Sequence, residues 1–166
     1  MPDPIWCMWF SGFVDGEGYF QISKSPNCGL ALTVTLREDD KEIIDEIHNN
    51  LLGHIYYLSY KRDRVKGKSS CNQWAWKIRK ISHIINIIIP IFELYPLRTK
   101  KRISYDIWKE AAWLLYNKNH LTETGQQRFF ELHEELIDSH RSPFSERGYM
   151  VTSPKILYPV QYEFHP

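Results

Sequence analysis

Two acidic residues lie among three glycines near the N-terminus, in the stretch FSGFVDGEGYF that begins at position 10. Asp15 and Glu17 supply carboxylate oxygens, which hold hard divalent cations and transfer protons. Gly12, Gly16 and Gly18 permit positive φ angles or the close approach of another backbone. Two interpretations follow: a plain turn whose acids point into solvent, or a helix end built for close packing around a charged site.

The residues before this stretch predict a helix from Pro4 to about Val14. Asp3 is a favourable N-cap residue, and proline is favoured at the first helical position. Apolar residues recur at helical spacing and predict a buried stripe of Ile5, Trp6, Trp9, Phe10 and Phe13. On another face Met8, Gly12 and Gly16 are spaced by four residues, and we expect that face to accept a second helix.

Two β-hairpins are predicted beyond the glycines, because polar and apolar residues alternate. The first pairs residues 19–25 with 30–37 across the turn PNCG. A helix capped by Asp39 or Asp40 then extends to about Leu52. The second hairpin pairs residues 54–62 with 72–80 across the basic loop RVKGKSS, and its apolar face carries Trp74, Trp76 and Ile78 as packing residues.

Further helices are predicted after the hairpins. Ser82 is the expected cap of a short helix that Pro90 disturbs. Thr99 is the expected cap of a helix to about Asn117, with a buried stripe of Ile103, Ile107, Ala111, Leu114 and Leu115. A last helix is expected over 124–138, with Phe130, Leu136 and Ile137 among its apolar positions, and 142–166 read as irregular.

This order, α-β-β-α-β-β-α, predicts a single α+β domain over residues 1–166. Its core covers about 3–117, and 118–166 form a helical extension and an irregular tail. Helices are expected to cover the apolar face of an antiparallel sheet and to leave the polar face open.

Charge and composition narrow the function classes. The net charge of +1 indicates no partner, but the segment from Ser59 to Arg102 contains twelve Lys or Arg residues and only two acidic residues, Asp63 and Glu93. The longest apolar stretch, 84–92, contains Asn86 and Pro90 and is too short for a membrane span. We found no targeting signal and no disulfide or zinc pattern among three cysteines, so we expect an intracellular protein in a bacterial, phage or organellar setting.

An open antiparallel sheet with a polar, basic face suits the major groove of double-stranded DNA, which admits a β-ribbon. A solvated lysine-rich surface is the simpler alternative. The predicted DNA contacts come from both hairpins and the later basic segment: Tyr19, Gln21, Ser23, Ser25, Thr33, Thr35, Arg37, Lys61, Arg62, Arg64, Lys66, Lys68, Gln73, Lys77, Arg79, Arg98 and Arg102.

The nine residues FSGFVDGEG resemble the LAGLIDADG motif of homing endonucleases, with Gly12, Asp15, Glu17 and Gly18 at the G, D, D and G of that motif. The predicted element order is that of the family. The segment YPLRTKKRISYDIW at 95–108 resembles the one that brings the family's active-site lysine. The segments LREDDKEIIDEI and LGHIYY resemble the family's second helix and third strand. The resemblance covers about residues 3–117.

This resemblance implies a LAGLIDADG-type fold with a DNA-binding saddle and, because the chain carries one motif, an intron-encoded homodimeric endonuclease. Met8, Gly12 and Asp15 would form the dimer interface. Glu17, with the carbonyl of Gly16, would hold Mg²⁺, and Lys100 would stabilise charge at the scissile phosphate. The family hydrolyses a phosphodiester in each strand and leaves short 3′ overhangs, at long pseudo-palindromic sites when the enzyme is a homodimer.

Two departures from the family pattern matter. Glu17 stands where aspartate is commoner, and Leu36 stands where many members have a glutamine that orients water; Arg37 is the candidate to replace that polar group. The alternatives are a non-cleaving nucleic-acid binder, such as an intron RNA maturase or a DNA-binding regulator, and an interaction domain whose basic hairpin is only surface.

Overall fold

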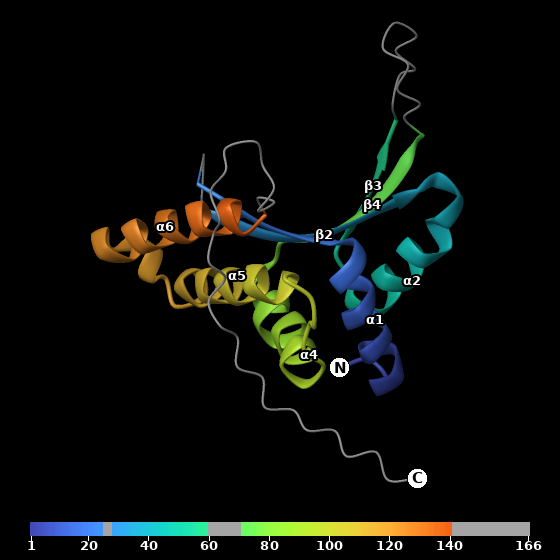
Figure 1. The fold of residues 1–166 in the computed structure, drawn as a ribbon, viewed down its shortest axis with the longest axis horizontal. Coiled ribbons are helices and arrows are strands. Elements are labelled where there is room, and N and C mark those ends of the chain that lie inside the picture. Colours follow the sequence, from blue (N-terminus) through green and yellow to red (C-terminus); the bar gives the residue numbers. More distant parts are fainter. Residues whose placement is uncertain (25–27, 60–70, 141–166) are drawn as a thin grey trace, which may run out of the picture.

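Four antiparallel strands form one sheet with helices packed on one side (Figure 1). The computed structural model describes residues 1–24, 28–59 and 71–140. The strands pair in the order β1-β2-β4-β3, and their bounds are β1 Gly18–Ser23, β2 Gly29–Arg37, β3 His54–Leu58 and β4 Gln73–Ile78. The longer helices are α1 Pro4–Glu17, α2 Lys41–Leu51, α5 Lys101–Tyr116 and α6 Glu123–Ser139.

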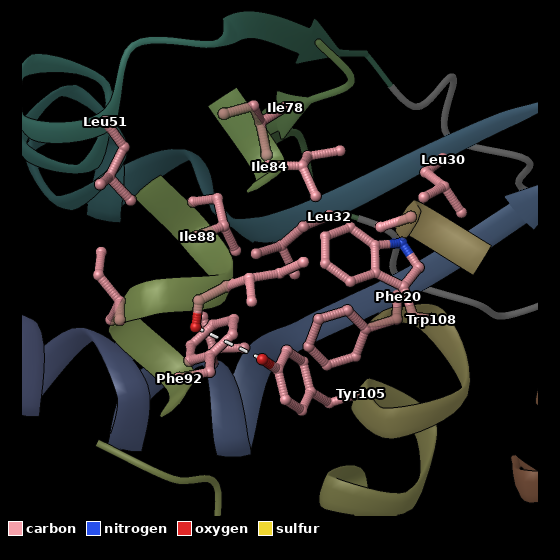
Figure 2. Close-up of a cluster of buried hydrophobic side chains, with 14 of the residues drawn as sticks. Phe20, Leu30, Leu32, Leu51, Ile78, Ile84, Ile88, Phe92, Tyr105 and Trp108 are labelled. Carbon is pink, nitrogen blue, oxygen red and sulfur yellow. Dashed lines mark hydrogen bonds between the residues drawn. The ribbon is translucent and has the colours of Figure 1, made fainter. Parts of the chain in front are cut away.

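The predicted element order is confirmed, and the core lies between the sheet and the helices. Rings from the sheet and from two helices meet there: Phe20 of β1 lies 5.1 Å from Trp108 of α5, and Phe92 lies 5.3 Å from Tyr105 (Figure 2). All four side chains are buried. Trp76 of β4 is also fully buried, so the packing role predicted for this tryptophan is correct. Phe10 of α1 joins this layer through contacts with Trp76 and Phe92, so the same aromatic cluster holds α1 and α5 against the sheet.

Helix α1 begins as predicted and ends later. The Asp3 side chain accepts hydrogen bonds from the backbone N–H groups of Ile5 and Trp6, and Pro4 opens the helix. The helix runs three residues past Val14, through Glu17. The predicted stripe is wrong in part: Cys7, Phe10, Ser11 and Val14 are buried, whereas Ile5 and Trp9 are exposed. Because α1 is apolar around most of its circumference, periodicity alone could not identify its core side.

The segment 81–94 is one helical run instead of a helix broken at Pro90. It comprises α3 Ile81–His83, a π-helical stretch η2 Ile84–Ile88 and α4 Ile89–Leu94. Lys80, and not Ser82, occupies the N-cap position. Proline lacks an N–H, and a π-turn changes the hydrogen-bond register just before Pro90, where the backbone N–H of Ile89 donates to the carbonyl of Ile84. The run therefore accommodates the proline.

The buried faces of the last helices also differ from prediction. On α5 the buried residues are Ser104, Tyr105, Trp108, Ala111 and Ala112, so four of the five predicted residues are only half-buried. On α6 they are Gly125, Phe129, Leu132 and Leu136, while Ile137 is exposed. A 3₁₀ turn, η3 Asn119–Leu121, joins the two helices. Trp108 and Phe129 each lie one position from a predicted core residue and take core positions instead.

Strands β1, β3 and β4 are shorter than predicted, whereas β2 begins one residue earlier than predicted, at Gly29. Helix α2 starts at Lys41 after a 3₁₀ turn, η1 Glu38–Asp40, and Asp40 takes the N-cap position without a side-chain hydrogen bond. The predictions for Ser25, for the loop residues Lys61, Arg62, Arg64, Lys66 and Lys68, and for the tail 142–166 fall outside the described residues. None of the helices in the described ranges combines the length and hydropathy that a bilayer crossing requires.

Candidate active site and nucleic-acid interface

The sequence DGEG forms the last turn of α1 and the first residue of β1. Glu17 ends the helix with an exposed side chain, and Gly18 begins the strand with extended backbone at φ −74°. Among described glycines only Gly53 has a positive φ, so the plain-turn interpretation is wrong. A Cβ on Gly18 would lie 2.5 Å from Cγ1 of Val14 and 2.8 Å from its carbonyl oxygen. The glycine is therefore needed for the close crossing from helix to strand.

Asp15 ties this helix end to the segment that precedes α5. Its carboxylate accepts hydrogen bonds from the backbone N–H of Arg98 (2.7 Å) and of Thr99 (3.1 Å), and from the Thr99 hydroxyl (2.6 Å). The Thr99 hydroxyl in turn accepts from the backbone N–H of Lys101 (3.2 Å). This chain of contacts fixes the start of α5 beside Glu17, so that Asp15 acts within its own chain.

Lys101, rather than Lys100, reaches the end of α1. Its Nζ donates to the carbonyl oxygens of Val14 and Gly16, both at 2.9 Å. Burial lowers the pKa of Lys101, while the nearby charges of Asp15 and Glu17 act to raise it. Cations favour helix C-termini. Lys100 is exposed. The two lysines are adjacent in the sequence, and the start of α5 determines which of their side chains points toward the end of α1.

The exposed face of α1 is apolar and lies opposite its buried face. Ile5 is 74% exposed, Met8 51% and Trp9 36%. Gly12 and Gly16 continue this face, and added Cβ atoms on them would have nothing within 4 Å. Of the predicted interface residues, Met8 and Gly12 belong to this face, whereas Asp15 turns toward Thr99.

The strand register sorts side chains onto the two sheet faces, because directly opposed residues point the same way. One face carries the core residues, such as Phe20, Leu32 and Ile78. The other, which we call the free face, has three cross-strand rows: Tyr19-Thr33-Lys77-His54, Thr35-Ala75-Tyr56 and Arg37-Gln73-Leu58. Two further pairs, Gln21-Ala31 and Ser23-Gly29, complete it.

The free face gathers most of the described residues predicted to contact DNA: Tyr19, Gln21, Ser23, Thr33, Thr35, Arg37, Gln73 and Lys77. Sequence reasoning missed the contribution of β3, namely His54, Tyr56 and Leu58. The available signal was the two-residue period of a strand, counted from Ile55, which packs against the core.

The remaining predicted DNA contacts lie apart from these rows. Arg79 is exposed just beyond β4, and Arg98 is exposed before α5. Arg102 is on α5, where it pairs with Asp106 at 3.2 Å and lies over the ring of Tyr105. The structure does not bring Arg102 into the free-face set.

Comparison with known proteins places the fold and the DGEG motif in one protein family. Residues 10–112, more than half of the chain, match the LAGLIDADG endonuclease family. The chain belongs to this family. "Probable intron-encoded endonuclease 2" of Neurospora crassa is 33% identical over 131 residues, and "Probable intron-encoded DNA endonuclease 1" of Mycosarcoma maydis is 29% identical over 124 residues. These matches cover 77% and 69% of this chain, but 26% and 40% of the relatives.

Solved LAGLIDADG enzymes share the architecture. I-SmaMI bound to cleaved DNA superposes with a TM-score of 0.67 at 26% identity, over 84% of this chain and 45% of that one. I-AabMI bound to uncleaved DNA gives a TM-score of 0.63 at 28% identity, over 79% of this chain and 43% of that one. This LAGLIDADG chain therefore spans less than half the length of the proteins it matches.

The end of α1 in this LAGLIDADG chain offers oxygen ligands that fit a hard divalent cation. They are the exposed carboxylate of Glu17 and the carbonyl of Gly16, which keeps a second lone pair after accepting from Lys101. Within residues 1–24, 28–59 and 71–140, no three His, Cys, Asp or Glu side chains gather closely enough to hold a metal together. The donors of one described chain alone are few for such an ion.

An open cleft of about 660 Å³ adjoins this site. It lies between β1, the start of α5 and the end of α6, and its lining includes Tyr19, Lys100, Lys101 and His140. The Tyr19 and His140 rings are 5.2 Å apart. Burial lowers the pKa of His140, and the charge of Lys101 lowers it further. His140 therefore favours the neutral form beside the basic residues.

Proposed function

We propose that this chain acts as a site-specific, double-strand DNA homing endonuclease. The observation that carries the proposal is the position of Glu17. Its exposed carboxylate ends α1 where β1 begins, beside Lys101 and next to the row that starts with Tyr19. In this proposal the free face recognises the bases, and the Glu17 carboxylate beside it serves hydrolysis.

Magnesium is the cofactor we propose, held by Glu17 and the carbonyl of Gly16. When bound, Mg²⁺ would lower the pKa of a water molecule and neutralise charge on the phosphate. Lys101 holds the last turn of α1 in place through its two carbonyl contacts, and so orients Glu17. Lys100, exposed and adjacent, has the reach of a flexible cation toward a phosphate and would stabilise its developing negative charge.

A homodimer through α1 would complete the site. The exposed apolar side chains Ile5, Met8 and Trp9, with the open glycines Gly12 and Gly16, suit close packing against a second copy. Two-fold contact would bring the two copies of Glu17 together. Two carboxylates beside two helix C-termini repel each other unless a cation neutralises them.

The homodimer is tested separately, by measuring the molar mass of the purified protein in solution. Gly12→Leu places a large side chain where α1 must approach its partner, and light scattering should then report a monomer. A wild-type chain that is already monomeric at tens of micromolar would remove the homodimer from the proposal.

A non-cleaving nucleic-acid binder is the second candidate, including one that binds intron RNA, and Leu36 is the observation that favours it. Leu36 packs against the core, as does its cross-strand neighbour Trp74, so the Leu36 side chain cannot orient water at the free face. Arg37 is on the free face and pairs with Asp39 at 3.1 Å. If this candidate is correct, DNA or RNA would bind and remain intact.

The proposed function is tested by exposing a randomised duplex library to the purified chain, with Mg²⁺ or with chelator, and sequencing all new ends. We expect Mg²⁺-dependent cuts with short 3′ overhangs at long, nearly palindromic sites. Ends that appear equally with chelator would show a contaminating activity. A library that is bound in a salt-sensitive manner but never cut would favour the binder.

A further inference from the structure

The three free-face rows differ in chemistry. The row nearest the end of α1 carries the ammonium group of Lys77, which lies 3.4 Å from the Gln21 side chain. The third row carries the guanidinium of Arg37 and the amide of Gln73. Lys and Arg suit guanine O6 and N7, and Gln suits adenine N6 and N7. These two rows can therefore donate hydrogen bonds to purines.

The middle row has no ammonium, guanidinium or amide group. It consists of Thr35, Ala75 and Tyr56, in direct register across β2, β4 and β3. Methyl groups and a phenol ring make up most of it, and Tyr56 is 43% exposed. The C5 methyl of thymine is the distinctive apolar feature that base edges present in the major groove, and Ala and Thr methyls are its usual contacts.

We propose that the middle row selects thymine, through its methyl group, in the DNA half-site, with Tyr56 as the main specificity determinant. This inference rests on the proposed DNA recognition by the free face. Tyr56 supplies the exposed apolar area, while Ala75 is small and covered, and Thr35 is half-buried. Base pairs that face this row would be read by shape and methyl contact, between two rows that read purines by hydrogen bonds.

The chain provides a matched control in the neighbouring residue. Tyr57 is also 43% exposed, but its register with Trp74 places it on the opposite face of the same strand. Its ring lies 4.7 Å from that of Trp74, and its hydroxyl donates to Glu38 at 2.9 Å. Equal exposure on opposite faces separates base reading from a general effect of losing a surface tyrosine.

The test starts with sequences that the full-length chain selects from a random duplex library in chelator. Each enriched thymine is then replaced, one at a time, by deoxyuridine, which lacks only the methyl. We expect one position in each half-site where this change weakens binding about fourfold, the effect of one methyl group leaving an apolar contact. At that position Tyr56→Asn should abolish sensitivity to uracil and shift selection toward adenine, a base that asparagine pairs with. Tyr56→Phe and Tyr57→Asn should select the wild-type sequences.

Three other outcomes would overturn, in turn, the methyl contact, the role of Tyr56 and the proposed DNA recognition. Uracil tolerated at every position by wild-type protein would overturn the methyl contact, and Tyr56→Asn selecting wild-type sequences would overturn the role of Tyr56. If no duplex is enriched and affinity does not fall with salt, the proposed DNA recognition itself fails.

Discussion

Replacing Lys101 by methionine should destabilise the chain, whereas the same change at Lys100 should not. Methionine is unbranched like lysine and one heavy atom shorter, and it removes the charge and the donor. Lys101 loses two hydrogen bonds of 2.9 Å, to Val14 and to Gly16. The Val14 carbonyl keeps the backbone N–H of Gly18 as a donor, and the Gly16 carbonyl is open to water.

The magnitude follows from these contacts. A charge-assisted hydrogen bond contributes about 1.5–3 kcal/mol. Two effects reduce the sum of the two hydrogen bonds to about 2 kcal/mol. Other donors remain available to both carbonyls, and the variant no longer buries a charge, the burial of which lowers the pKa of Lys101. Lys100 is exposed, and in the described part of the chain its side chain makes no hydrogen bond or ion pair, so Lys100→Met should change the free energy of unfolding by less than about 0.5 kcal/mol.

Urea unfolding followed by tryptophan fluorescence measures the difference. Wild type and both variants should be compared at one protomer concentration, because a dimer's stability depends on concentration. An unchanged slope m with a lower midpoint for Lys101→Met alone supports the reasoning. Equal midpoints for the two variants would refute the placement of Lys101 at the end of α1.

Three further predictions concern glycine packing, the pH dependence of unfolding and the salt dependence of DNA binding. Gly18→Ala should lower the free energy of unfolding by about 2 kcal/mol, because the added Cβ would lie 2.5 Å from Val14. Gly12→Ala has open space around its Cβ, so it should stabilise the helix by roughly 0.5–1 kcal/mol while it weakens the dimer. Equal effects of the two substitutions on unfolding would contradict this packing. Burial and the 2.7 Å hydrogen bond to Glu93 raise the pKa of Tyr105, so the unfolded chain loses this proton first: stability is complete below about pH 10 and falls above it. Tyr105→Phe should reduce that fall, and a wild-type curve that is flat to pH 11 would count against it. In 1 M salt the duplex affinity of wild type should drop steeply, and an unchanged affinity would remove phosphate contact from the account.

The sheet was the most predictable part of the fold. Alternation along 19–25 and 30–37 assigns faces directly, since a strand has a period of two and one side must be apolar. Phe20, Ile22, Leu32 and Val34 are buried on the face that alternation predicted. The same rule could have placed Tyr56 on the free face.

Helix faces were less predictable where apolar residues surround the helix. The stripe that contains Ile5 and Trp9 was assigned to the core, but both are exposed. In a chain that would pair through α1, such residues remain apolar for the partner. The choice between Lys100 and Lys101 likewise depended on the hydrogen bonds between Asp15 and Thr99, which set where α5 begins. Those contacts join residues far apart in sequence and leave no local pattern.

The central claim, that Glu17 serves hydrolysis and not recognition, is tested most directly by measuring binding and cleavage of one selected duplex with wild type and Glu17→Gln. The substitution keeps the size of the side chain and removes its charge at an exposed position. The account predicts that the two proteins bind the duplex with similar affinity in chelator, and that only wild type cleaves it when Mg²⁺ is added. Cleavage by Glu17→Gln at the wild-type rate would contradict the account.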